Sequence, residues 1–118
     1  MNVFRINILM ERLVPTTLTG ATNAAYLADL ETTVNYITSK GAYAMICPHN
    51  YGRYYNNIIT DTAGFQAFWK TVATPFKSNS KVMFDTNNEC TYSPPSSTQV
   101  SVQLPTQTTT WPAASSPR

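Results

Sequence analysis

The chain has 118 residues, a formal net charge of +2, and charged side chains at 12% of its positions. A chain of this length predicts one small domain. The few Lys and Arg residues form no cluster, and no apolar run reaches the roughly 18 residues of a membrane span, so neither a nucleic acid nor a membrane is expected as a partner.

The first strand and the first helix are predicted before residue 41. Residues 3–8, VFRINI, are rich in β-branched side chains and predict a strand. A polar loop is expected at residues 9–23, with Thr22 or Asn23 as the N-cap of the helix that follows. Residues 24–40 place apolar side chains at helical spacing, and a glycine directly after them is a suitable stop. The apolar positions are Leu27, Leu30, Val34 and Ile37.

The same alternation continues to residue 88. Residues 42–47, AYAMIC, predict a second strand that is apolar throughout and is ended by a proline. A second loop, rich in aromatic and polar side chains, follows at residues 49–62. Residues 63–76 predict a helix, and residues 81–88, KVMFDTNN, predict a third strand. The helix is expected to bury Phe65, Phe68, Trp69, Val72 and Phe76.

The order strand, helix, strand, helix, strand predicts an α/β fold with three parallel strands and right-handed crossovers. Such a unit is incomplete, because both outer strands present unpaired backbone groups and one face of the sheet carries apolar side chains without a covering helix. A homodimer, with or without exchanged segments, is therefore expected.

Residues 90–118 differ in composition from the rest of the chain. They are dominated by Ser, Thr, Pro and Gln, and Arg118 is their one charged residue. This composition is typical of a linker or a disordered segment, so a domain is predicted at residues 1–89 and a tail at residues 90–118. The exception is residues 99–105, QVSVQLP, whose alternating pattern fits a strand that adds to a sheet edge of its own chain or of a partner.

The carboxyl ends of parallel strands are where α/β folds bind ligands, and three polar segments are expected to meet there: INILMER, CPHNYGRYYNN and TNNE. Their aromatic rings and amides suit a sugar, because rings pack on pyranose units and amides bond to hydroxyl groups. Arg5 is expected to reach this rim from within its strand. The other rim residues are Arg12, His49, Asn50, Tyr51, Arg53, Tyr54, Tyr55, Asn87, Asn88 and Glu89.

Four segments resemble glycoside hydrolase family 5, and most of all its fungal endo-β-1,4-glucanases, the cellulases. They are FRINILMERLVP, GAYAMICPHNYGRYYNNII, FWKTVA and VMFDTNNE, and the resemblance covers residues 1–89 without a break. Members of this family are (β/α)8 barrels with a retaining mechanism. The resemblance therefore implies a partial TIM barrel running from barrel strand 2 to strand 4, a β-glucan or cello-oligosaccharide ligand, no cofactor, and an extracellular location.

The resemblance also implies roles for individual residues. Glu89 matches the general acid/base carboxylate of the family, and Asn88 matches the residue that binds sugar hydroxyls near the cleaved bond. His49 matches the active-site histidine after strand 3, and Arg5 matches the strand-2 arginine that supports the nucleophile. The residues expected to bind substrate are Asn50, Tyr51 and Tyr54. For the loop tyrosines a packing role stays open as well, since such residues also form lids.

After Glu89 the sequence departs from the family, which continues there into helix 4. The family nucleophile is a second glutamate on strand 7, and the chain has no counterpart for it, so a truncated gene product is expected. No secretory signal precedes the first strand. Three functions follow as alternatives: an inactive fragment that keeps part of a sugar-binding cleft, a hydrolase assembled as a dimer, and a non-catalytic module that associates with itself.

The remaining acidic residues, the cysteines and the histidine predict no further catalytic or metal site. Strand geometry separates Asp85 from Glu89 by about 13 Å, too far for the carboxyl pair of a retaining enzyme. Cys47 has no base beside it in sequence, and alternation points Cys90 to the other side, so neither a thiol catalyst nor a disulfide is expected. One histidine and two separated cysteines match no zinc-site spacing, so no metal is predicted.

Overall fold

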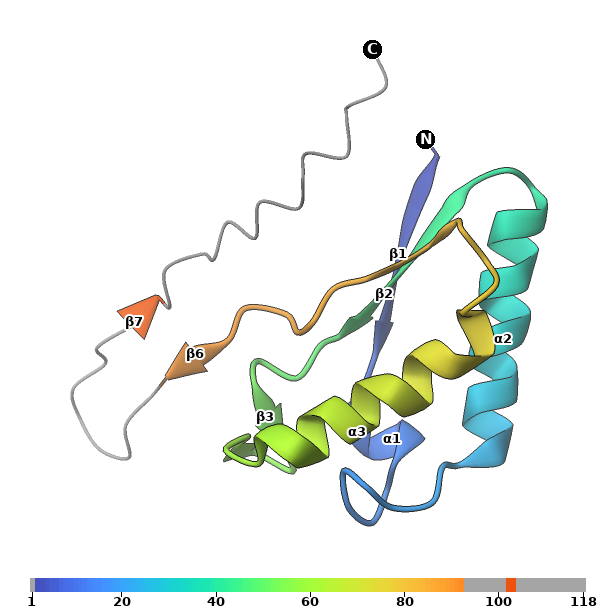
Figure 1. Cartoon of the computed structure of the whole chain (residues 1–118). Helices are drawn as coiled ribbons and strands as arrows, with labels where there is room; N and C mark the ends of the chain where they lie inside the picture. The colour runs from blue at the N-terminus through green and yellow to red at the C-terminus, as the bar shows by residue number, and fades with distance from the viewer. Residues whose placement is uncertain (1, 93–101, 104–118) are drawn as a thin grey trace.

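The computed structural model describes residues 2–92 and 102–103. Three parallel strands form the main sheet in the order β1-β2-β5, and the chain alternates between these strands and the helices α2 and α3 (Figure 1). This order confirms the predicted α/β architecture. The elements are β1 Val3–Ile8, α1 Met10–Leu13, α2 Ala24–Ser39, β2 Tyr43–Pro48, β3 Arg53–Tyr54, β4 Asn57–Ile58, α3 Thr62–Ala73, the 3-10 turn η1 Thr74–Phe76, β5 Val82–Phe84, β6 Thr91–Tyr92 and β7 Val102–Gln103.

Local signals set the ends of α2. The side chain of Asn23 accepts a hydrogen bond from the backbone N–H of Tyr26 at 3.2 Å, so it is the N-cap. At the other end Gly41 has a φ of +83°, and its N–H bonds to the carbonyl of Thr38. The N–H of Ala42 bonds to the carbonyl of Ile37, which completes a Schellman motif. The predicted stop at this glycine is confirmed.

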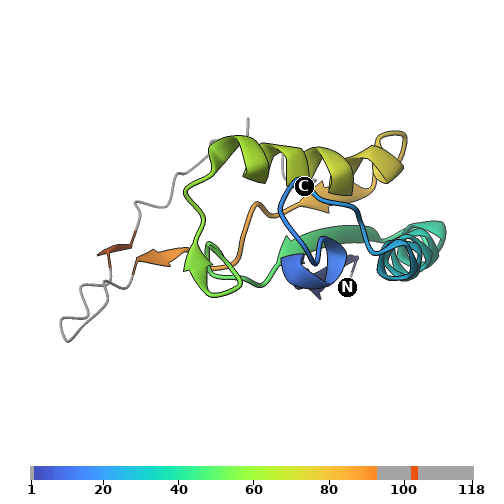
Figure 2. The ribbon, with the colours of Figure 1, turned by 90° about the horizontal axis from the view of Figure 1, so that it is seen from below.

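The core lies between one face of the main sheet and the two long helices. Figures 1 and 2 show α2 and α3 packed beside the strands, with β6 and β7 projecting away from them. The predicted apolar faces of both helices are confirmed, because their residues are buried or pack against the core. The buried core residues are Ile8, Met10, Leu13, Val14, Leu30, Val34, Ala44, Ile46, Phe68, Val72 and Phe76.

The other face of the sheet has no covering helix in the described part of the chain. Alternation places every second strand residue on it. Val3 and Tyr43 are 36% and 39% exposed there, as expected for apolar side chains without a covering layer. Arg5 and Cys47 have the same parity and lie nearer the carboxyl ends of their strands. This face and that end of the sheet therefore position the candidate site.

The expectation of a polar loop at residues 9–23 was wrong at its beginning. Residues Met10–Leu13 form the short helix α1, and Met10, Leu13 and Val14 are fully buried. A single helical turn is too short for periodicity to reveal it. Its first N–H is satisfied from a distant part of the chain, since Met10 donates to the Asn50 side chain at 3.0 Å.

Two more expectations about strands need correction. The third strand is shorter than predicted, because β5 pairs with β2 only over Val82–Phe84, and the residues after it leave regular strand geometry. The loop at residues 49–62 contains a hairpin, in which β3 and β4 pair antiparallel. Its two-residue strands carry too little alternation to predict.

The tail contributes a second small pairing. Thr91–Tyr92 pair antiparallel with Val102–Gln103, two of the residues in the strand predicted within residues 99–105. These two strands form a sheet of their own, apart from the main sheet, and the predicted tail strand as a whole stays a prediction. The rest of the predicted strand and tail lies outside the described residues. Over the described part of the chain, no helix has the length and apolarity needed to cross a membrane.

Candidate functional site

Arg5 lies at the centre of a polar cluster on the open face of the sheet. Its Nη2 atom is 2.6 Å from Asn88 Oδ1, 2.8 Å from Cys47 Sγ and 3.3 Å from Asp85 Oδ2. These groups come from β1, from β2 and from the segment after β5. The Arg5 side chain thus links β1 to the end of β2 and to the segment that follows β5.

The contact with Arg5 fixes the orientation of the Asn88 amide. A guanidinium carries only donors, so the atom facing it must be the amide oxygen, and within residues 2–90 the Nδ2 group donates to no other residue. The backbone N–H of Asn88 bonds to the carbonyl of Pro48 at 2.9 Å, and the residue is only 7% exposed. The amide is therefore held at its oxygen and its backbone, with the NH2 group of Nδ2 available to an oxygen of a ligand.

Burial and charge decide the ionisation of this cluster. Burial raises the pKa of the Cys47 thiol to about 11, and the hydrogen bond to Asp85 adds to the rise, while Arg5 partly opposes it. The hydrogen bond to Cys47 and the contact with Asp85 raise the pKa of Arg5. Cys47 therefore stays a neutral thiol at ordinary pH, whereas a nucleophilic cysteine needs a depressed pKa.

His49 and Tyr51 lie together directly after β2. Their ring centroids are 5.1 Å apart at an interplanar angle of 77°, an edge-to-face contact. The N–H of His49 bonds to the carbonyl of Ile8 at 2.8 Å, so β1 anchors the start of the loop. Tyr51 is 41% exposed and has a φ of +55°, a conformation that tyrosine rarely adopts. Together they form an aromatic wall at the rim.

Asn50, unlike its neighbours, turns into the protein. Its Oδ1 accepts from Met10 N, its Nδ2 donates to Glu11 Oε2 at 2.8 Å, and it is 8% exposed. The other oxygen of Glu11 accepts from the N–H of Tyr55 at 2.6 Å. Both ends of the Asn50 amide are thus engaged by the chain itself. This geometry favours a supporting role over the substrate contact expected from the sequence.

Tyr54 is also tied to the loop after α1. Its hydroxyl donates to the carbonyl of Val14, and Tyr55 donates to that of Pro15. Burial raises the pKa of Tyr54, and the nearby Tyr55 and Glu11 add to the rise. The two rings line a pocket of about 320 Å³ beside the β3–β4 hairpin. The engaged hydroxyls support the packing alternative for these two tyrosines, and their substrate-binding role stays a prediction.

Glu89 follows the fixed Asn88 in an unusual backbone conformation. Its φ is +35°, its side chain is exposed, and it forms no hydrogen bond with another of residues 2–90. The segment around it is held from both sides, since Asn88 bonds to Pro48 and Arg5, and Cys90 packs against Gly52. An exposed carboxylate on a well-anchored segment is suited to proton transfer with a ligand.

Sequence reasoning misjudged two residues near the site. Asp85 was considered only as a second carboxylate, and it is instead the ion-pair partner of Arg5. Its odd-numbered position, shared with Arg5 and Cys47 on neighbouring strands, was a usable signal. Arg12, predicted on the rim, lies over the ring of Tyr26 on α2, 5.2 Å from its centroid, and is not part of this cluster.

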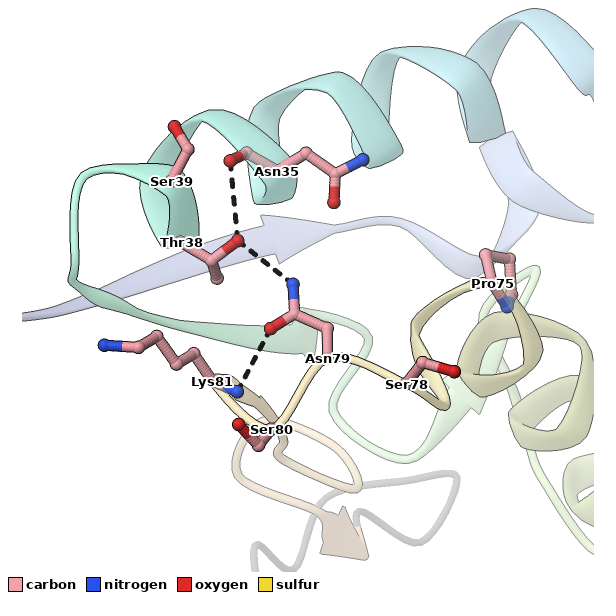
Figure 3. Close-up of a pocket in the computed structure, with 8 residues that line it drawn as sticks. All are labelled: Asn35, Thr38, Ser39, Pro75, Ser78, Asn79, Ser80 and Lys81. Atoms are coloured by element: carbon pink, nitrogen blue, oxygen red, sulfur yellow. Dashed lines mark hydrogen bonds between the residues drawn. The ribbon is translucent and has the colours of Figure 1, made fainter.

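A larger pocket of about 480 Å³ lies at the amino ends of the strands, between the end of α2 and the turn before β5 (Figure 3). The amide of Asn79 is used within its wall, because Nδ2 donates to Thr38 and Oδ1 accepts from the N–H of Lys81. None of the candidate residues lines this pocket. Over the described residues, no three His, Cys, Asp or Glu side chains gather in a way that would hold a metal ion.

Comparison with known proteins agrees with the α/β fold described above and with the family resemblance of the sequence. The chain is 58% identical over 88 residues to Endoglucanase gh5-1 of Neurospora crassa. This alignment covers 75% of this chain and 23% of the relative. The solved endo-beta-1,4-glucanase Xac0029 of Xanthomonas axonopodis pv. citri superposes with a TM-score of 0.70 at 34% identity, over 76% of this chain and 29% of that one. The structure of XacCel5A in complex with cellopentaose gives 0.69 at 26% identity, over 75% and 29%.

The chain thus spans about a quarter of the length of the curated relatives it matches. Its parallel α/β unit matches part of a TIM barrel, as predicted. The boundary predicted after residue 89 stays a prediction. The family model for Cellulase (glycosyl hydrolase family 5) matches residues 1–114. The chain therefore belongs to glycosyl hydrolase family 5, the cellulase family.

Proposed function

We propose that this chain carries the acid/base side of a β-1,4-glucanase site, with Glu89 as the acid/base carboxylate. The observation that carries the proposal is the Arg5–Asn88 hydrogen bond of 2.6 Å. It leaves the NH2 group of Asn88 as a donor, next in sequence to an exposed carboxylate that forms no hydrogen bond within residues 2–90. A hydroxyl-binding donor beside a proton-transferring group is the arrangement that glycoside hydrolysis uses.

The proposed substrate class is β-1,4-glucan and its oligosaccharides. The cellopentaose complex of the similar XacCel5A supports this class. The aromatic wall of His49 and Tyr51 offers a partly exposed ring for packing against a sugar. Because cellulose is an insoluble polymer, an enzyme acting on it must meet it outside the cell, so an extracellular location belongs to the proposal.

We further propose that residues 1–118 alone hydrolyse β-glucan at a negligible rate. Retaining hydrolysis needs two carboxyl groups roughly 5 to 5.5 Å apart. Three acidic residues besides Glu89 are already engaged: Glu11 with Asn50 and Tyr55, Asp61 as the cap of α3, and Asp85 with Arg5. The last two, Asp29 and Glu31, lie on α2. No acidic residue is thus free beside Glu89 to act as nucleophile.

Binding is tested by titrating the chain with cellopentaose. Tyr51→Ala is expected to weaken binding by about tenfold, since a lost ring contact costs on the order of 1 kcal/mol. Tyr36→Ala is the matched control, because Tyr36 is 66% exposed on α2, away from the site, and its removal is expected to change nothing. Equal loss in both variants, or no binding by the wild-type chain at millimolar sugar, would refute the proposed ligand.

The role of Glu89 is tested in a chimera. Residues 2–89 replace the matching segment of the Neurospora crassa endoglucanase, which supplies the rest of the barrel. Glu89→Gln in this chimera is expected to lower kcat on carboxymethylcellulose by about 10² to 10⁴, the usual contribution of general acid/base catalysis. Retained activity would exclude Glu89. Activity of the isolated chain close to that of the intact relative would contradict its proposed inactivity.

A homodimer is part of the proposal, because β1 and β5 are the outer strands of the main sheet and its open face leaves Val3 and Tyr43 exposed. Phe4 on β1 and Phe84 on β5 are also 46% and 37% exposed. A second copy would cover these side chains and pair the edge strands. Light scattering at micromolar concentration is expected to give twice the mass of the chain, and a stable monomer would exclude the dimer.

A further inference from the structure

Two asparagine side chains connect the three loops at the carboxyl ends of the main strands. Asn50, in the loop after β2, accepts from Met10 N at the start of α1. Asn87, in the segment after β5, accepts from the N–H of Gly52 through Oδ1 at 3.1 Å. Its Nδ2 contacts Met10 Sδ at 3.8 Å. Asn87 therefore touches both of the other loops, although sequence reasoning named it only as one of many rim residues.

The place where Asn87 contacts the β2 loop is tightly constrained. Tyr51 and Gly52 follow one another in the left-handed region, with φ of +55° and +73°, and this turn directs the N–H of Gly52 toward Asn87. A Cβ atom at position 52 would lie 3.2 Å from Cys90 Sγ. The loop thus packs against the residues on either side of the Asn88–Glu89 pair, and Asn87 supplies the polar link.

We propose that Asn87 is a positioning residue, which holds the segment bearing Glu89 at a fixed distance from the loop bearing His49 and Tyr51. The inference rests on the proposed function, because the sugar would lie between these two segments. Placement of catalytic and binding groups matters at the scale of 1 Å, and loops reach this precision only when supporting hydrogen bonds fix them. The bond from Gly52 to Asn87 is a direct side-chain link between these two loops.

The hydrogen bond itself is tested by NMR on the wild-type chain without sugar. A through-bond coupling between the Gly52 amide nitrogen and the Asn87 side-chain carbonyl carbon is expected, and its absence would overturn the proposal. Asn87→Ala is expected to speed amide exchange at Gly52 by about tenfold and to shift the signals of His49, Tyr51 and Glu89. Asn87→Asp keeps an acceptor oxygen and is expected to restore slow exchange.

The positioning role is tested by cellopentaose binding. Asn87→Ala is expected to raise Kd by about tenfold, and Asn87→Asp to return it to within about threefold of wild type. Asn35→Ala on α2 is the control, since that exposed asparagine lies far from the site and should change neither readout. A purely structural role would lower stability and leave the Kd of the folded fraction unchanged, which would overturn the proposal. So would failure of Asn87→Asp to restore binding.

Two further outcomes, a variant that does not fold and a wild-type chain that does not bind the sugar, can be distinguished from a failure of the positioning role. If Asn87→Ala does not fold, Asn87→Gln takes its place, because it keeps the amide but moves the acceptor by one bond, and wild-type affinity in this variant would contradict positioning. If the wild-type chain does not bind cellopentaose, the proposed function fails. The shifts of His49 and Glu89 in the Asn87 variants then decide positioning alone, and unchanged shifts would overturn it.

Discussion

The two ends of the main sheet contain similar residues and use them differently. At the amino ends of β2 and β5, the polar groups satisfy neighbouring backbone in relaxed geometry: the left-handed residue there is Gly41, and Asn79 bonds to a nearby hydroxyl and N–H. At the carboxyl ends, the left-handed region holds non-glycine residues. Among the described residues these are Tyr51, Tyr55, Asn56 and Glu89, of which asparagine alone adopts this conformation readily.

This difference indicates where the chain accepts strain in order to place side chains. A non-glycine residue in the left-handed region costs on the order of 1 kcal/mol, so such residues persist only where surrounding contacts enforce them. The enforcing contacts at the carboxyl end come from Asn50, Asn87 and Arg5, which cross between loops. At the amino end, Asn79 and Lys81 also bond to the end of α2 and to Gly41, but the left-handed residue in that turn is a glycine, which needs no enforcing contact.

The largest expected difference in the free energy of unfolding is between variants of Asn50, at the carboxyl end, and Asn79, at the amino end. Asn50→Ala leaves the buried N–H of Met10 and a half-buried carboxylate oxygen of Glu11 without these partners, and we expect the free energy of unfolding to fall by about 3 kcal/mol. Asn79→Ala, at the other end, removes two half-buried bonds and should cost about 1 kcal/mol. Urea unfolding of both variants measures this, and equal costs would break the comparison.

Gly52 and Gly41 lie at opposite ends of the sheet, and both have a φ in the left-handed region, so they form a second matched pair. Gly52→Ala forces a left-handed alanine and places its Cβ 3.2 Å from Cys90 Sγ, so a loss of about 2 kcal/mol is expected. Gly41→Ala has the same conformational penalty with no atom within 4 Å, and should cost about 1 kcal/mol. Thermal unfolding measures both variants. A larger loss of stability in Gly41→Ala than in Gly52→Ala would show that the contact with Cys90 does not constrain position 52.

The thiol beside Arg5 predicts an alkaline dependence that belongs to the carboxyl end alone. Cys47 has a pKa of about 11 in the folded chain against an ordinary value of 9.0. Between these values the unfolded thiol loses its proton and the folded one keeps it, so the free energy of unfolding falls as pH rises from 9 to 11. Below pH 9 the contribution is fully present. Cys47→Ser should reduce this slope without abolishing it, because burial also raises the pKa values of Cys90 and Tyr54. An unchanged slope in the variant would rule out Cys47 as a contributor.

The smallest effect is expected in the pocket at the amino end. Ser80 is exposed in its wall, so Ser80→Ala should change the free energy of unfolding by less than about 0.5 kcal/mol. The affinity of the Ser80→Ala variant for cellopentaose should equal that of the wild-type chain. A marked loss of affinity in calorimetric titration would place sugar binding at this end of the sheet and reverse the functional contrast.

Local patterns predicted the fold well, because the fold depends on local signals. The helical spacing from Leu27 to Ile37, the Asn23 cap and the glycine stop all act within a few residues of one another, and the structure contains each of them. The helix α1 escaped prediction for the opposite reason. Its buried turn depends on the Asn50 side chain, which lies far along the sequence.

The candidate site was predictable in its membership more than in its geometry. Parity on parallel strands was enough to bring Arg5 and the end of β5 together. It could not show that Asn50 turns inward, or that Asp85 is occupied by Arg5. The conformation of Glu89 breaks the alternation on which the prediction relied, since its φ is positive. That departure depends on contacts with the β2 loop, which no local pattern records.

The register of the main sheet has a consequence for how the chain folds. Val3 pairs with Tyr43, and Ala44 pairs with Val82, so both pairings close loops of nearly the same length. Each strand is joined to the next through a segment that contains one long helix, α2 or α3, and the loop-closure entropy of the second pairing is therefore close to that of the first. The sheet can grow by one strand and one helix at a time, each addition meeting a similar kinetic barrier on the edge that the previous addition has just formed.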